Sequence, residues 1–132
     1  MEHHLTFEHL PGISKVIFCL VNRKRIQADI MNIDIQRVEK RRSLTREQMK
    51  EVLRSEGFSG IHQFSDSPGR EYPDHQHDYV EVRWVVEGEV TFGVGDREYQ
   101  LKPGDRLDMP ANTVHSARIH PEKGATYICA SK

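Results

Sequence analysis

Three histidines and one glutamate in this chain have the types and spacings of ligands to a single metal ion. His75, His77 and Glu81 lie in the stretch GREYPDHQHDYVEVRWVVEG, residues 69–88. Side chains alternate between the two faces of an extended chain, so these three are expected on one face. Imidazole nitrogen and carboxylate oxygen suit Mn, Fe, Co, Ni, Cu or Zn. His115, in GDRLDMPANTVHS (104–116), is the candidate for the fourth ligand.

Two further side chains are candidates for binding a substrate beside the metal. Arg83 has the same strand parity as the candidate ligands, so it is expected to point inward, where its guanidinium needs an acidic partner. That partner is either a substrate carboxylate or an internal residue, for which Glu71, Glu98 and Asp108 are available. Tyr72 is expected near the pocket mouth, as an acid or hydrogen-bond donor. No residue stands out as a general base.

The segment from residue 69 to residue 88 resembles the first sequence motif of the cupin superfamily. Its residues stand at every fixed position of that motif: Gly69, His75, His77, Glu81 and Gly88. The segment from Gly104 to His115 resembles the second motif, with Pro110 also in place. The family's usual glycine falls at Asn112, and asparagine is the next most tolerant residue of a left-handed backbone, so the turn is expected to survive. Ile119 replaces the asparagine that trails the histidine in the family.

The resemblance covers roughly residues 58–131 and is to small single-domain cupins. It implies an all-β jelly-roll barrel, that is, a double-stranded β-helix, which holds a divalent transition metal (Fe, Mn, Ni, Cu or Zn) through His75, His77, Glu81 and His115. Cupins with these ligands include dioxygenases, isomerases and decarboxylases. The expected function is therefore a metal-dependent enzyme of one of these types, acting on a small carboxylate or polar substrate. The alternative is a non-catalytic cupin module that binds a small ligand as a sensor.

Composition limits the number of domains, the kinds of partner and the cellular location that are expected. The 132 residues suffice for one domain with a buried core. A formal net charge of -1 is not the strongly basic balance of a nucleic-acid-binding domain, so no nucleic acid partner is expected. Cys19 and Cys129 form no C-x-x-C pair, which favours a reduced, cytoplasmic location. The apolar run Val16–Val21 is too short to cross a membrane, and no membrane association is expected.

One helix is predicted, from about residue 46 to residue 56. Thr45 is its expected N-cap, Gln48 stands at the capping-box position and Gly57 ends the helix. Apolar residues at helical spacing form a stripe, which consists of Met49, Val52 and Leu53. The expected partner of this stripe is the face of the following strand that carries Trp84, unless that face forms a dimer interface. A homodimer is expected, because small cupins commonly pair.

Short strands joined by turns are predicted for the rest of the chain. They are expected in segments 60–67, 80–86, 89–94, 97–101, 105–109, 113–119 and 125–130. Glu87-Gly88 is predicted to join the second and third as a hairpin, and Gly95-Asp96 the third and fourth. Such a series favours an antiparallel sandwich or barrel.

The chain is expected to divide into an N-terminal extension, residues 1–42, and a cupin barrel domain, residues 43–132, that begins with the helix. Within the extension, residues 32–39 carry a partial strand pattern. Val16–Val21 is either a buried strand or part of an unpacked tail.

Overall fold

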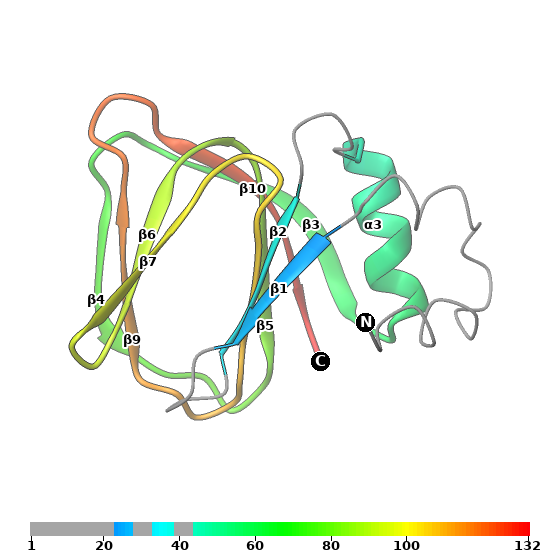
Figure 1. Cartoon of the computed structure of the whole chain (residues 1–132), viewed down its shortest axis with the longest axis horizontal. Helices are drawn as coiled ribbons and strands as arrows, with labels where there is room; N and C mark the ends of the chain where they lie inside the picture. Colours follow the sequence, from blue (N-terminus) through cyan, green and yellow to red (C-terminus); the bar gives the residue numbers. More distant parts are fainter. Residues whose placement is uncertain (1–22, 28–32, 39–43) are drawn as a thin grey trace.

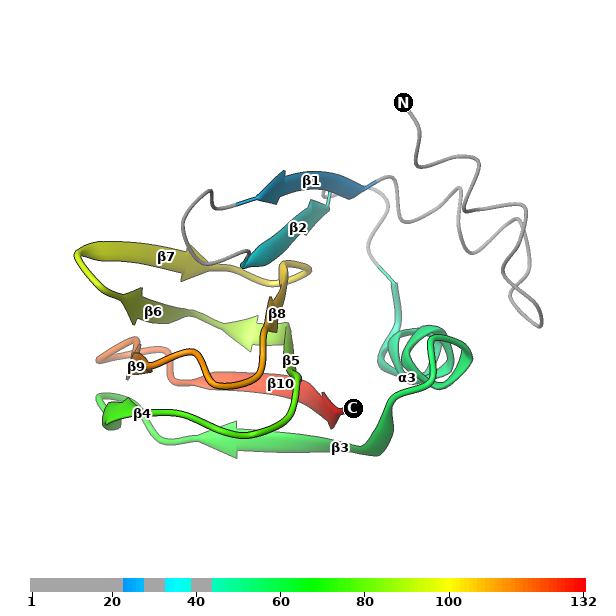
Figure 2. The same cartoon turned by 90° about the horizontal axis from the view of Figure 1, so that it is seen from below.

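The computed structural model describes residues 23–27, 33–38 and 44–132. In this part of the chain, ten strands form two antiparallel sheets that face each other, and one helix packs outside them (Figures 1 and 2). The predicted all-β architecture with one helix is confirmed for the described residues.

The strands divide unequally between the two sheets. The larger sheet contains six strands, in the order β1 (Arg23–Gln27), β2 (Asp34–Val38), β8 (Arg106–Met109), β5 (Glu81–Gly88), β10 (Ala125–Ser131) and β3 (Ser59–Asp66). The smaller sheet contains four, in the order β4 (Glu71–His75), β9 (His115–Ile119), β6 (Val90–Val94) and β7 (Arg97–Leu101). From β3 to β10 the chain passes repeatedly from one sheet to the other, as in a jelly roll.

Helix α3 (Arg46–Ser55) begins with the capping box that the sequence predicts. The backbone N–H of Gln48 donates to Oγ1 of Thr45 at 3.1 Å, and the backbone N–H of Thr45 donates to the Gln48 side chain at 2.9 Å. Gly57, after the last turn, has a φ of +91°, a left-handed conformation that glycine adopts without strain. Both ends of the helix are therefore set by local sequence.

Two hydrophobic clusters lie on the two faces of the six-stranded sheet. The first, between the sheets, contains Val85 of β5 and Tyr127 of β10. The second contains the apolar stripe of α3 together with Val82 and Trp84, on the other face of β5. Trp84 is only 1% exposed, so the helix covers this face as predicted.

The predicted hairpin at Glu87-Gly88 is wrong. β5 pairs with β8 and β10, whereas the next strand, β6, pairs with β7 and β9 in the other sheet. Gly88 has a φ of +76°, and a Cβ there would collide with the carbonyl oxygen of Gly124. Only glycine fits this close backbone approach, which lets the chain change sheets. The predicted hairpin at Gly95 does form, between β6 and β7.

The predicted N-terminal extension contributes two strands to the larger sheet. β2 pairs with β8, and β1 pairs with β2 at the edge. The sequence pattern indicated β2 but not β1, which contains the basic tripeptide Arg23-Lys24-Arg25. The segment Val16–Val21 lies outside the described residues. The domain boundary between residues 42 and 43 stays a prediction.

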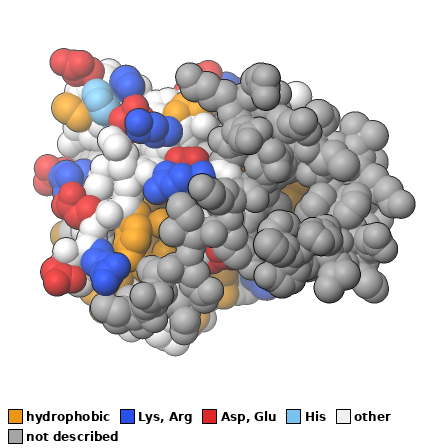
Figure 3. All heavy atoms as spheres, in the orientation of Figure 1, with side chains coloured by type: hydrophobic (Ala, Val, Ile, Leu, Met, Phe, Trp, Pro, Cys, Tyr) orange, Lys and Arg blue, Asp and Glu red, His pale blue; other side chains and the backbone are white. Residues whose placement is uncertain are grey.

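The described surface carries charges of both signs. On the face shown in Figure 3, Lys and Arg side chains are interspersed with Asp and Glu side chains. Exposed ion pairs include Arg118–Glu98 at 2.9 Å and Lys123–Glu89 at 2.8 Å. Among the described residues, no helix has the length and apolar character needed to span a membrane.

Candidate metal centre

Two strands and one loop bring the three predicted histidines together. His75 is the last residue of β4 and is paired in register with His115, the first residue of β9. His77 lies in the loop that leads from β4 to β5. The backbone N–H of Asn112 donates to the carbonyl of His77 at 2.6 Å, which ties this loop to the turn before β9. Asn112 has a φ of +61°, so the predicted left-handed turn is confirmed.

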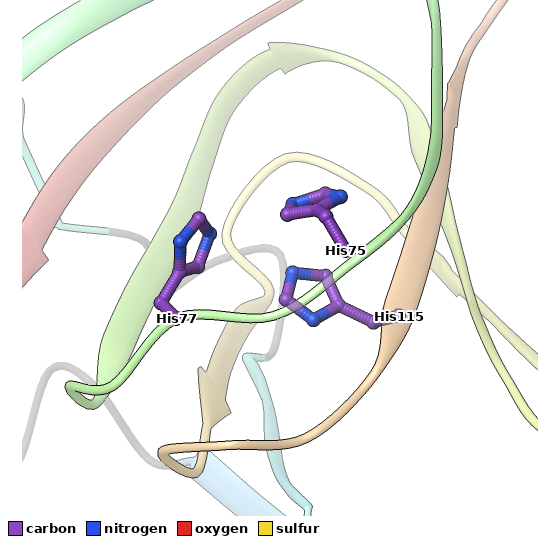
Figure 4. A group of neighbouring side chains, drawn as sticks. All are labelled: His75, His77 and His115. Carbon is purple, nitrogen blue, oxygen red and sulfur yellow. The ribbon is translucent and has the colours of Figure 1, made fainter.

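The three imidazole rings converge. One ring nitrogen from each of His75, His77 and His115 lies within 4.8 Å of the other two. The ring centroids are 4.3 Å apart for His75 and His115, and 4.9 Å apart for His75 and His77. Figure 4 shows the three rings grouped together, two from the β4 segment and one from β9.

Hydrogen bonds decide which ring nitrogen is available to a metal. Nδ1 of His75 lies 2.8 Å from the carbonyl oxygen of Pro73, and Nδ1 of His115 lies 2.8 Å from that of Thr113. A carbonyl oxygen only accepts, so each Nδ1 carries a proton, and in the neutral ring each Nε2 keeps its lone pair. Nε2 of His77 is buried and has no hydrogen-bond partner among the described residues. Burial lowers the pKa of His77, which favours its neutral form. These donors fit a divalent transition metal.

Glu81 approaches the histidines from the other sheet. Its Oε1 lies 3.4 Å from Nε2 of His77 and 3.6 Å from Nε2 of His115. The expectation that an extended chain places His75 and Glu81 on one face is wrong, because β4 ends at His75 and β5 begins at Glu81 after a loop. The carboxylate therefore meets the imidazoles across the interior between the sheets, and not along one strand.

Arg83 holds the second oxygen of Glu81. Nε and Nη2 of Arg83 donate to Oε2 at 3.0 and 2.5 Å. Burial alone would raise the pKa of Glu81, but the nearby imidazole of His115 and the positive charge and hydrogen bonds of Arg83 outweigh burial and lower the pKa to about 2. The sequence left two kinds of partner for Arg83, a substrate carboxylate or an internal acid. The structure contains an internal acid. This acid is Glu81 and not one of the three that the sequence analysis considered.

The rest of the Arg83 guanidinium faces strand β10. Nη1 lies 3.4 Å from Sγ of Cys129, and the guanidinium carbon lies 4.9 Å from the centroid of the Tyr127 ring. Burial raises the pKa of the Cys129 thiol, so the sulfur is neutral near pH 7. A neutral thiol is a weak acceptor. Nη1 therefore keeps capacity to bind an oxyanion.

Tyr72 and Tyr127 share an acceptor that the sequence analysis missed. The hydroxyl of Tyr72 donates to Oδ1 of Asp66 at 2.6 Å, and the hydroxyl of Tyr127 donates to Oδ2. Asp66 is the last residue of β3 and is 6% exposed. It belongs to neither motif, and its only signal in the sequence is an acidic residue inside a predicted strand.

Comparison with known proteins identifies the family. A family model described as a cupin domain matches residues 63–131, which is more than half of the chain. The chain belongs to the cupin family, as its two motifs predict. The matched span contains all four candidate ligands.

The individual relatives either match less than half of the chain or have less than 20% sequence identity to it. Quercetin 2,3-dioxygenase from Bacillus subtilis (strain 168) is 46% identical over 57 residues, which are 42% of this chain and 17% of that protein. The chain thus spans less than a fifth of the length of this curated relative. A cupin-like protein from Thermotoga maritima has a TM-score of 0.50 at 18% identity, over 83% of this chain and 66% of that one. AerE from Microcystis aeruginosa has a TM-score of 0.50 at 16% identity, over 83% and 44%. These two structures share the fold.

Proposed function

We propose that this chain is a small metal-dependent enzyme whose divalent transition metal is held by His75, His77, His115 and Glu81. The observation that carries the proposal is the convergence of three ring nitrogens within 4.8 Å of one another. Nε2 of His77 is buried without a hydrogen-bond partner among the described residues, which is costly unless a ligand satisfies it. Oε1 of Glu81 is the nearest carboxylate oxygen to two of the rings and supplies the oxygen donor.

The protein's own part in the reaction is to orient the substrate. A bound divalent ion supplies a Lewis acid with open positions for substrate or dioxygen. Nη1 of Arg83, whose contact within the protein is a thiol sulfur at 3.4 Å, binds an oxyanion of the substrate. Tyr72 is the second substrate contact. Burial raises the pKa of Tyr72, so its hydroxyl stays protonated near neutral pH; it donates that proton to Asp66 and offers an oxygen lone pair to a hydrogen-bond donor of the substrate.

Dioxygenase chemistry is the reaction type that we favour over isomerase and decarboxylase chemistry. Its support is the 46% identity, over 57 residues, to a quercetin 2,3-dioxygenase. That protein is much longer than this chain, so we assign only the substrate class that the side chains indicate, a small carboxylate or polar molecule. The competing function is a non-catalytic cupin module that binds a small ligand.

Metal content tests the proposal directly. We expect about one equivalent of Fe, Mn, Ni or Cu in protein purified without added metal or chelator, and none in His77→Ala. The matched control is His62→Ala, because His62 is exposed on β3 and its Nδ1 contacts the carbonyl of Gly60. Elemental analysis of the three proteins measures the difference. Absence of metal from the wild type, even after reconstitution, would sink the enzyme proposal and favour the ligand-binding module.

Substitution of Arg83 tests its role at the substrate. Arg83→Gln should lower the affinity of the metal-loaded protein for oxalate by about tenfold, because one charge-assisted hydrogen bond is lost. Isothermal titration calorimetry measures this affinity. Arg118→Gln, which removes an exposed ion pair with Glu98, is the control and should leave it unchanged. If Arg83→Gln loses stability but binds oxalate normally, Arg83 serves only its internal ion pair.

A further inference from the structure

Asp66 lies where the two sheets meet and has bonds to both of them. Tyr72, which donates to its Oδ1 at 2.6 Å, belongs to β4 of the four-stranded sheet. Tyr127, which donates to its Oδ2, belongs to β10 of the six-stranded sheet. Asp66 is 6% exposed, so its carboxylate has little access to water and depends on these donors.

Contacts run from Asp66 to the candidate metal centre through Tyr127. The Tyr127 ring, fixed at its hydroxyl by Asp66, lies 4.9 Å from the guanidinium carbon of Arg83. Arg83 in turn donates twice to Oε2 of Glu81. The other oxygen of Glu81 lies 3.4 and 3.6 Å from the nitrogens of two histidines. We call Asp66, Tyr127, Arg83 and Glu81, in this order, the polar chain.

We propose that Asp66 is a positioning residue for the centre: through Tyr127 it fixes Arg83, and through Arg83 it fixes the carboxylate of Glu81. The same residue orients Tyr72, the other proposed substrate contact. This inference rests on the proposed metal site. One buried carboxylate outside both cupin motifs thus sets the positions of the oxygen ligand and of both substrate-binding side chains.

The physical reason lies in the freedom that each link would otherwise have. A tyrosine ring whose hydroxyl has no hydrogen bond can tilt within the core. A guanidinium that lies over the ring then moves with it. Burial raises the pKa of Tyr127, so its hydroxyl remains a donor over the whole neutral range. Tyr127 can therefore donate to Asp66 throughout that range.

A purely structural role is the competing explanation, because the bonds of Asp66 also join the two sheets. Such a role would change the stability of the protein but not the coordination of a bound metal. The matched control is Ser65→Ala. Ser65 precedes Asp66 on β3, and its hydroxyl lies 2.8 Å from that of Thr126 on β10, outside the polar chain. This variant removes one side-chain hydrogen bond from the same strand pair.

Cobalt binding separates the two explanations. Metal-free wild type, Asp66→Asn, Tyr127→Phe and Ser65→Ala are titrated with Co²⁺, and the visible absorption of the loaded proteins is recorded. That absorption depends on the number and geometry of the ligands. We expect Asp66→Asn and Tyr127→Phe to bind Co²⁺ about tenfold more weakly, as when a group that orients a ligand is removed, and to show a shifted spectrum. Ser65→Ala should match the wild type in both measurements.

The outcomes are distinguishable. If Tyr127→Phe or a folded Asp66→Asn has the wild-type spectrum and affinity, the positioning role of Asp66 is overturned while the metal site stands. If Asp66→Asn does not fold, Tyr127→Phe alone decides, since it breaks the polar chain at the next link and leaves Asp66 bonded to Tyr72. If the wild type itself binds no Co²⁺, the proposed function fails, and this inference fails with it.

Discussion

The two oxygens of Glu81 face different partners. Oε1 lies beside the imidazoles of His77 and His115, while Oε2 is bonded to Arg83. A buried carboxylate without a countercharge would cost several kcal/mol, and the guanidinium removes most of that cost. The same bond prevents the carboxylate from turning, so Glu81 offers only Oε1 to the proposed metal.

Glu81 should make the stability of the metal-free protein depend on pH in the acid range. Its pKa falls from an ordinary value of 4.5 to about 2 on folding. Between these values the unfolded chain binds more protons, so the free energy of unfolding decreases as the pH falls, by on the order of 3 kcal/mol in total. Arg83→Gln removes one of the charges that lower the pKa and should flatten this dependence. Urea unfolding at a series of pH values measures both slopes, and equal slopes would contradict the role of Arg83.

Motif spacing predicted which histidines lie together, because each motif places its residues at the end of a strand. It could not predict the groups that orient the rings. The carbonyls of Pro73 and Thr113 accept hydrogen bonds from the Nδ1–H groups, and this depends on the local path of the backbone. Asp66 was missed for a different reason: its contacts require that β4, in the other sheet, and β10, distant in sequence, both come to the end of β3.

Helix α3 is attached to the larger sheet at its C-terminus as well as along its apolar stripe. Arg106 of β8, 2% exposed, donates to Glu56 at 2.7 Å and to Asp108 at 2.7 Å. Its guanidinium also lies 5.1 Å from the centroid of the Trp84 ring. Glu56 is the C-cap residue of the helix, so this ion pair fixes the end of α3 above Trp84.

Truncation of the stripe should destabilise the whole protein. Leu53 is fully buried between α3 and the sheet. Leu53→Ala should lower the free energy of unfolding by about 2–5 kcal/mol, because burial is lost and a cavity is left. Glu51→Ala, on the exposed side of the same helix, should change it by less than about 0.5 kcal/mol. Urea unfolding followed by Trp84 fluorescence measures both. A small effect of Leu53→Ala would mean that the helix is not part of the cooperative unit.

Local elements were easier to predict than their pairing. The capping box and the stripe of α3 are encoded within about a dozen residues, and both were predicted correctly. The strand β5 was recognised from its alternation, yet its partners β8 and β10 are distant in sequence. The hairpin at Gly88 was predicted wrongly because a glycine turn between two strands has the same sequence signal whether the strands pair with each other or enter different sheets.

At the scale of the whole molecule, the largest apolar face outside the barrel interior is covered within one chain. The face of Trp84, which the sequence left open to a dimer partner, is covered by α3. That face consequently gives no reason to expect a homodimer. The homodimer remains a prediction, based on the frequent pairing of small cupins. The cytoplasmic location remains a prediction, based on the absence of a C-x-x-C pair.

The proposed metal should stabilise a protein that already folds without it. The ligands come from both sheets, His75 and His115 from the smaller and Glu81 from the larger, so a bound ion joins the two. None of the candidate ligands belongs to the hydrophobic core between the sheets. A ligand that binds only the folded state adds about 2.7 kcal/mol at a concentration one hundred times its Kd. We therefore expect the Tm of the metal-free protein to rise with added Co²⁺, and that of His77→Ala to stay constant at the metal-free value. Calorimetry decides the matter: a metal-free chain that shows no cooperative transition would make the metal a requirement of the fold, as in zinc fingers, and the histidines structural.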